Sequence, residues 1–205
     1  MIALFLLKEK ENLLFFWLYL LLVMGFGALQ IFFSPTVLFE SINQFVNEKL
    51  NIFFEIFTWV GSGWTYGAVC LLVLIFNRKY FWLFVSSFAA TSLVAQTIKY
   101  FLPNVARPVE FFSQQKIAIN FPIGAEELHW NSFPSGHTIS AFSMFLLLSL
   151  LSKNKIVVLL CFVSAVLVAL SRVYLTAHFV RDIYWGMILG TEITSLMCFG
   201  CLKIK

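Results

Sequence analysis

The sequence predicts an all-α membrane protein, a bundle of six transmembrane helices that forms a single domain over residues 1–205. Hydrophobic residues make up 60% of the chain and charged residues only 12%, against about 25% charged residues in an ordinary soluble domain. A soluble domain of 205 residues has too little interior to bury this much apolar surface. An aromatic content of 18% excludes a disordered chain.

Six apolar stretches are candidates for membrane spans, each of which needs about 20 predominantly apolar residues. They run over about 13–33, 52–76, 80–98, 138–151, 156–173 and 183–201. The first stretch is too long and too aromatic for a signal-peptide core, so an uncleaved helix is expected. The fourth stretch is short, so its first turn is expected to lie in the preceding segment Pro134-Ser135-Gly136-His137.

The distribution of lysine and arginine indicates the orientation of the chain. With six spans, both termini lie on one side, and that side holds eight of the 14 basic residues: Lys8, Lys10, Arg78, Lys79, Lys153, Lys155, Lys203 and Lys205. We therefore expect both termini in the cytoplasm and the loops 34–51 and 100–133 on the outer face. The first of these loops has apolar residues at roughly helical spacing, which predicts either a helix in the membrane interface or a cap over the bundle.

Charge and cysteine content exclude other kinds of protein. The net charge is only +4 and the basic residues are scattered, so nucleic acid is not an expected partner. The cysteines fall inside apolar runs and are expected to be buried small hydrophobes: Cys70, Cys161, Cys198 and Cys201. Glycines of the second span are expected to permit close helix packing: Gly61, Gly63 and Gly67.

Three polar segments on the outer side carry the candidate chemistry. They are Lys99-x7-Arg107-Pro108, Pro134-Ser135-Gly136-His137 and Ser171-Arg172-x5-His178-x3-Asp182. The three cations are Lys99, Arg107 and Arg172. They would repel one another in a low-dielectric environment unless an anion of high charge density binds between them. Arginine forks match phosphate oxygens, and lysine serves as a point charge. Ser135 and Gly136 precede a helix start, where backbone N–H groups attract an anion. The segments together predict a phosphate-binding site.

Two histidines add reactive groups to this site. His178 and Asp182 are four residues apart, so a helix places them on one face. A carboxylate that accepts one imidazole N–H fixes the tautomer and leaves the other nitrogen free to attack. His178 is therefore the candidate nucleophile, and His137 is the candidate proton donor to a leaving oxygen. The cations supply the charge stabilisation that magnesium supplies elsewhere, so we expect neither a metal nor another cofactor.

In this order and spacing, the three segments resemble the signature of the type 2 phosphatidic acid phosphatase family. Its pattern is K-x(6 or more)-R-P, then P-S-G-H, then S-R-x5-H-x3-D, and the resemblance covers about the last 110 residues. It implies a phosphohistidine at His178, with Asp182 as its partner and His137 as the general acid. It also implies a set of phosphate-binding residues: Lys99, Arg107, Ser135, Gly136 and Arg172. Ser171 is expected only to support a neighbour.

The expected function is hydrolysis of a lipid phosphate or diphosphate at the outer leaflet of a membrane, which the resemblance suggests is a bacterial inner membrane. Related enzymes act on undecaprenyl diphosphate, phosphatidylglycerol phosphate, phosphatidic acid or lipid A phosphates. The expected partners are the phosphorylated lipid and membrane lipids. Two alternatives stay open: a phosphotransferase that passes the phosphoryl group to another acceptor, and a non-catalytic protein that binds or transports lipid.

Four ionisable residues that are not among the named motif residues have weaker expectations. His129 is expected to be a solvated loop residue, with a metal site or a head-group contact as alternatives. Arg181 is expected to face away from Asp182, as an interface residue or a head-group contact. Glu55 is close enough to the outer helix end to reach water, whereas Glu192 lies near mid-membrane and is expected to face the bundle.

Overall fold

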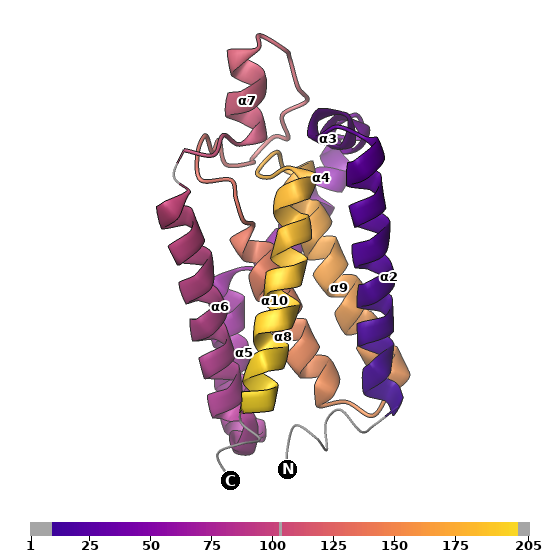
Figure 1. Ribbon diagram of the computed structural model, residues 1–205, viewed down its shortest axis with the longest axis vertical. Coiled ribbons are helices and arrows are strands. Elements are labelled where there is room, and N and C mark those ends of the chain that lie inside the picture. The colour runs from indigo at the N-terminus through magenta and orange to yellow at the C-terminus, as the bar shows by residue number, and fades with distance from the viewer. Residues whose placement is uncertain (1–9, 103, 201–205) are drawn as a thin grey trace.

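The chain folds as a bundle of helices, and the computed structural model describes residues 10–102 and 104–200. Within these ranges it contains helices and no strand, which confirms the all-α prediction. Long helices run side by side, and the short helices α3 and α7 lie at one end of the bundle (Figure 1). The elements are α2 (Lys10–Phe32), α3 (Pro35–Asn43), α4 (Glu48–Val60), α5 (Gly63–Phe76), the 3-10 helix η1 (Arg78–Tyr80), α6 (Phe81–Phe101), α7 (Pro108–Gln114), α8 (Gly136–Leu150), α9 (Lys155–Tyr174) and α10 (Val180–Gly200).

Several of these helices are long and apolar enough to cross a membrane. Within the described ranges, three pass by length and composition: Leu13–Phe32, Arg78–Phe101 and Lys155–Tyr174. Helices α4 and α5 qualify only as a pair, α8 is apolar but shorter, and α10 carries three charged residues. Large apolar side chains such as Phe76, Trp82 and Ile31 are exposed, as expected where lipid replaces water. The chain is an integral membrane protein, and the count of six spans stays a prediction. Lys8, Cys201, Lys203 and Lys205 lie outside the described residues.

The predicted continuous span 52–76 is wrong in one respect, because the chain breaks there and bends by 52° between α4 and α5. The Ser62 hydroxyl accepts a hydrogen bond of 3.2 Å from the Thr65 amide and so starts a new helix. A Cβ on Gly61 would collide with Val168 and would lie 3.2 Å from the carbonyl oxygen of His137. The expectation of close packing therefore holds for Gly61, whereas a Cβ on Gly67 would meet no described atom within 4 Å. On one side of this bend, α4 packs against α9, the helix that carries Arg172 of the candidate site.

Helix α8 lies at the centre of the bundle and is buried along most of its length. It packs closely on α10 through two glycines one turn apart. A Cβ on Gly190 would lie 2.5 Å from the carbonyl oxygen of Ile139, and one on Gly186 would lie 2.9 Å from Cβ of Thr138. Small residues at this spacing let helix backbones approach within a membrane. The contact fixes the start of α8 against the start of α10.

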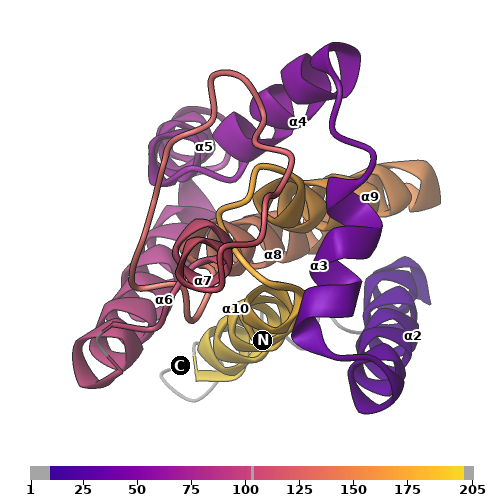
Figure 2. The ribbon, with the colours of Figure 1, turned by 90° about the horizontal axis from the view of Figure 1, so that it is seen from above.

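The outer loops form a partial cover over this end of the bundle. The helix predicted within 34–51 is present as α3, and its buried Phe39 packs 5.2 Å from Phe112 and 5.8 Å from Phe179 between ring centroids. This packing supports the predicted cap, and a position of α3 in the membrane interface stays a prediction. The loop 100–133 contains the short helix α7, which the sequence pattern did not predict and which begins at Pro108. The chain between α7 and α8 passes over α4 and α5 (Figure 2). As predicted, Cys70, Cys161 and Cys198 are buried.

Candidate active site

The three polar segments meet at one end of the bundle. In Figure 1 this end is opposite to the one at which α2 begins and α10 ends. The end of α6, the start of α8, the end of α9 and the start of α10 contribute to the site. The Ser135 amide donates a hydrogen bond of 3.1 Å to the carbonyl oxygen of Asp182, which joins the second segment to the third.

His178 and Asp182 form a buried pair at the centre of the site. Nδ1 of His178 lies 3.6 Å from Oδ2 of Asp182, and the two side chains are 2% and 0% exposed. The same Oδ2 accepts hydrogen bonds from the Ser132 hydroxyl at 2.5 Å and from the Phe179 amide at 3.0 Å. Burial lowers the pKa of His178 to about 3, and the charges of Arg107 and Arg172 act in the same direction, against the opposing effect of Asp182. The ring is neutral at pH 7, and its Nε2 is the nitrogen that points away from the carboxylate.

Arg107 is held in place by backbone carbonyl groups. Its Nε donates to Trp130 at 2.7 Å, and its two terminal nitrogens donate to Ala177 at 2.9 Å and to Asn131 at 3.3 Å. One terminal nitrogen, Nη1, also lies 3.4 Å from Nε2 of His178. Burial lowers the pKa of Arg107, an effect that the carboxylates of Asp182 and Glu126 oppose. The guanidinium is thus fixed beside Nε2 of His178.

The other two cations complete a positive cluster. Arg172 is 7% exposed and donates from Nη1 to the hydroxyl of Thr58 on α4. Its Nε is buried and has no hydrogen-bond partner within the described part of the chain. The charge of Lys99, at the end of α6, interacts with the charges of Arg107 and Arg172. Three cations with spare donors in one place are suited to bind a phosphate group.

The Pro134–His137 segment begins α8, as predicted, with Ser135 as its N-cap. The Ser135 hydroxyl accepts a hydrogen bond of 2.9 Å from the Thr138 hydroxyl. A Cβ on Gly136 would meet no described atom within 4 Å, so the space beside this backbone is open to a ligand. Ser171 differs from the other predicted residues, because its hydroxyl donates to the carbonyl oxygen of Val168 at 2.7 Å and is satisfied within its own helix.

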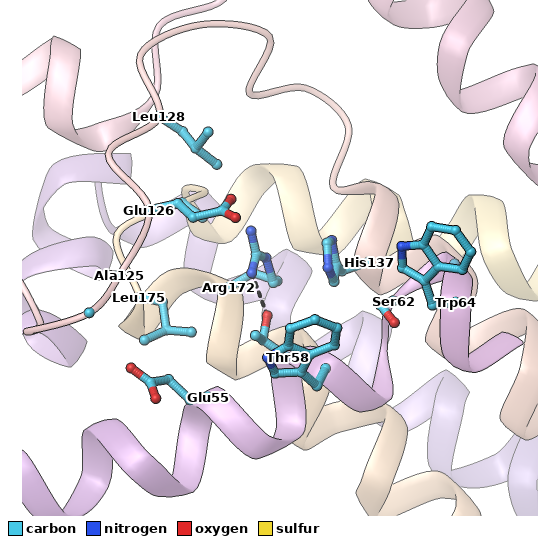
Figure 3. A pocket seen from close by; sticks show the side chains of 14 residues that line it. Glu55, Thr58, Ser62, Trp64, Ala125, Glu126, Leu128, His137, Arg172 and Leu175 are labelled. Atoms are coloured by element: carbon cyan, nitrogen blue, oxygen red, sulfur yellow. Dashed lines mark hydrogen bonds between the residues drawn. The ribbon is translucent and has the colours of Figure 1, made fainter.

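A pocket of about 770 Å³ adjoins this cluster and is shown in Figure 3. His137 and Arg172 line it from α8 and α9, and Thr58 and Trp59 line it from α4. Its outer rim includes Trp64, which is 85% exposed. The pocket therefore extends from His137 and Arg172 to residues on both sides of the bend between α4 and α5.

Several contributors to the site were missed by the sequence analysis. Ser132 carries no local signal beyond its place before the Pro134–His137 segment. Thr58 comes from α4, the helix before the bend, and Glu126 comes from the loop between α7 and α8. Arg181 was expected to face away from Asp182, which is wrong, because its Nε lies 3.7 Å from Oδ1 of Asp182.

Two acidic residues have partners that the sequence did not indicate. Glu110 pairs with His129, with 2.9 Å between Oε2 and Nδ1, and also accepts a hydrogen bond of 2.8 Å from Gln114. The hydrogen bonds from Gln114 and His129 lower the pKa of Glu110. His129 is therefore a half-exposed residue that connects α7 to the outer loop.

Glu192 accepts a hydrogen bond of 3.1 Å from the hydroxyl of Tyr19 on α2.

The fold and the site define a class: a helical membrane protein with a buried histidine–aspartate pair beside a cluster of three cations. A sequence profile described as the PAP2 superfamily matches residues 80–200, and the chain belongs to this superfamily. This is the family that the three motifs indicated.

Individual relatives are similar over different lengths. Phosphatidylglycerophosphatase B of Bacillus subtilis (strain 168) is 47% identical over 83 residues, which cover 36% of this chain and 41% of that enzyme. The chain thus spans less than half the length of this relative. Undecaprenyl-diphosphatase of Sulfolobus acidocaldarius is 30% identical over 161 residues, which cover 78% of this chain and 74% of that protein.

Solved structures share the architecture. The crystal structure of Aquifex aeolicus LpxE is similar with a TM-score of 0.69 and 26% identity, and the match covers 80% of this chain and 94% of that chain. A transmembrane PAP2-type phosphatidylglycerolphosphate phosphatase from Bacillus subtilis has a TM-score of 0.69 at 24% identity, over 95% of this chain and 98% of that chain. The second likeness concerns the fold alone.

Proposed function

We propose that this protein is a lipid phosphate phosphatase that works through a phosphohistidine at His178. The observation that carries the proposal is the surroundings of the His178 ring. Asp182 and Ser132 lie on the Nδ1 side, at 3.6 Å and 3.5 Å, whereas the Arg107 guanidinium lies 3.4 Å from Nε2. A carboxylate on one nitrogen and a cation beside the other orient a neutral imidazole towards a bound phosphate.

The reaction proceeds in two balanced steps. Nε2 of His178 forms a bond to phosphorus while the bond between phosphorus and the lipid oxygen breaks. A phosphate dianion favours the protonated form of the nearby His137, which gives its proton to the departing oxygen, so the lipid leaves as a neutral alcohol. A water molecule then attacks phosphorus and gives a proton to His137. The bond between phosphorus and nitrogen breaks, and inorganic phosphate is released.

Charge stabilisation comes from the cation cluster. Lys99, Arg107 and Arg172 bind the non-bridging oxygens, and the start of α8 at Ser135 and Gly136 adds backbone N–H donors. These groups take the role that a divalent metal has in other phosphatases, so we propose that the reaction is independent of metals. Removal of one such donor costs about 10²–10³ in kcat in comparable anion sites.

The proposed lipid substrate is supported by the membrane setting and by two relatives whose names are phosphatidylglycerophosphatase B and undecaprenyl-diphosphatase. The pocket between the site and the exposed Trp64 gives a lipid a route that keeps its tails in the bilayer. We propose that the chain is a single domain of six spans in a bacterial inner membrane, with the site on the periplasmic side and both termini in the cytoplasm.

The test is release of phosphate by the purified protein in detergent with a chelator present. The panel holds phosphatidylglycerol phosphate, phosphatidic acid, lipid A and undecaprenyl diphosphate. We expect release from at least one lipid, loss of release in His178→Ala, and retention in the control His129→Ala, whose ring lies outside the cation cluster. Release that persists in His178→Ala would contradict the phosphohistidine, and release that stops with the chelator would contradict metal independence.

The alternative is a phosphotransferase that uses the same phosphohistidine. The pocket beside His137 has a volume of about 770 Å³, which admits water and also a larger acceptor. Substrate consumption that exceeds the phosphate released, with the difference recovered on a second lipid or sugar, would establish the transferase instead.

A further inference from the structure

The pocket beside the phosphate site has charges of both signs. Arg172 lines its inner side, and its buried Nε has no hydrogen-bond partner among the residues that the structure describes. Two carboxylates also line it, Glu55 from α4 and Glu126 from the chain before α8. Figure 3 shows both carboxylates beside the pocket, with Glu126 close to Arg172. An anion in this pocket is attracted by Arg172 and repelled by Glu55 and Glu126.

Neither carboxylate accepts a hydrogen bond from another side chain or amide within residues 10–102 and 104–200. The charge of Glu126 acts on the nearby Arg107 and Arg172. Gly124 leaves room for Glu55, because a Cβ there would lie 2.9 Å from Oε1 of Glu55, and its φ of +86° favours glycine. The negative charge of Glu126 supports protonation of Arg107, which places this carboxylate within electrostatic reach of the phosphate site.

The position of the carboxylates relates them to the leaving group. A phosphate held by the cations directs its ester oxygen towards His137, which must protonate it, and His137 lines the same pocket as both carboxylates. The leaving group of the substrate, which begins at this oxygen, therefore enters the pocket that contains the carboxylates of Glu55 and Glu126. Hydroxyl groups there donate hydrogen bonds to carboxylates, and such charge-assisted bonds are about twice as strong as neutral ones. A second phosphate there meets like charge.

We infer that the substrate is a lipid phosphate monoester whose leaving alcohol carries further hydroxyl groups, such as a glycerol or sugar head group, and that a polyprenyl diphosphate is disfavoured. This inference rests on the proposed function and narrows it. Glu55 and Glu126 are the specificity-determining residues. The diphosphate is disfavoured because its second phosphate would lie beside Glu55 and Glu126, where a monoester places its leaving alcohol.

The experiment compares kcat/KM for three substrates: phosphatidylglycerol phosphate, whose leaving group bears a free hydroxyl, phosphatidic acid, whose leaving group does not, and undecaprenyl diphosphate. In the unmodified protein, kcat/KM is expected to be highest for phosphatidylglycerol phosphate, lower for phosphatidic acid and lowest for undecaprenyl diphosphate. In the double variant Glu55→Gln with Glu126→Gln, the ratio of the first to the third substrate falls on the order of tenfold, as expected when like charge is removed from a partly wet site. The control is Glu127→Gln, which changes a neighbouring carboxylate that pairs with His129 at 3.9 Å and lies outside the pocket lining.

The outcomes separate this inference from the proposed function. Release of phosphate from none of the lipids by the unmodified protein would overturn the proposed function. The inference would be overturned by a higher kcat/KM for the diphosphate, or by a ratio of kcat/KM values that the double variant leaves unchanged. Either result would be compatible with the proposed phosphatase function. A fall in the ratio that the control variant reproduces would also overturn it, because the effect would then come from the charge of the whole loop.

Discussion

Replacement of Ser132 by alanine tests whether the His178–Asp182 pair depends on a third residue. The Ser132 hydroxyl is fully buried, donates to Oδ2 of Asp182 at 2.5 Å and lies 3.5 Å from Nδ1 of His178. A hydrogen bond to a charged group contributes about 1.5–3 kcal/mol. Since each 1.36 kcal/mol is about tenfold in rate, Ser132→Ala is expected to lower kcat by about 10- to 100-fold. Loss of the orienting carboxylate itself costs about 10⁴ in a serine protease triad, which sets an upper bound.

The assay is steady-state release of phosphate, read as separate kcat and KM values. The loss is expected in kcat, because Ser132 orients the nucleophile and does not hold the phosphate. A matched control is Ser149→Ala, which removes another fully buried serine whose hydroxyl donates within its own helix to Leu146 at 2.7 Å. Unchanged kcat in Ser132→Ala, or an equal loss in both variants, would refute the reasoning.

Four further outcomes follow from the site and the packing. Lys99→Met is expected to raise KM for phosphate substrates by about 10- to 100-fold, since it removes a charge-assisted contact; an unchanged KM would remove this residue from the phosphate site. His137→Gln is expected to lower kcat by about 10²–10⁴ for a lipid alcohol but much less for p-nitrophenyl phosphate, whose leaving group needs no proton, and equal losses would contradict the role of general acid. Because burial lowers the pKa of His178 to about 3, nitrogen NMR of labelled histidine should show a neutral ring at about pH 5, and a protonated ring would refute this environment. Gly190→Ala places a Cβ 2.5 Å from a backbone oxygen, so it is expected to lower thermal stability in detergent through overpacking of about 1–3 kcal/mol, whereas Gly67→Ala should have little effect; equal melting temperatures would contradict the close contact.

The sequence predicted the parts of the site that consist of ionisable residues, because the chemical role of such residues can be inferred from their type and spacing. Charged residues are rare in an apolar chain, so the cations and the His178–Asp182 pair stood out and the structure brings them together. The start of α8 in the Pro134–His137 segment was also predictable, because the apolar stretch after it was too short for a span.

The parts that were missed depend on contacts between distant segments. The break between α4 and α5 lies in a continuously apolar stretch, in which Gly61 and Ser62 have no signal that distinguishes a bend from close packing. Ser132 lies 50 residues from its partner Asp182, and a lone serine in a loop indicates nothing by itself. Helix α7 is only seven residues long, too short for a periodic pattern to appear.

The anchoring of Arg107 makes the outer loop a part of the candidate active site that cannot be exchanged on its own. The amide of Arg107 donates to the carbonyl oxygen of His129, and the Ser132 amide donates to Val105, so two stretches of the loop are paired along their backbones. The same arginine reaches Ala177, 70 residues further along the chain. A chimera that takes this loop from a relative would therefore import the conformation of its arginine together with its head-group contacts. Loop and helices of such a chimera would have to be chosen as a matched set.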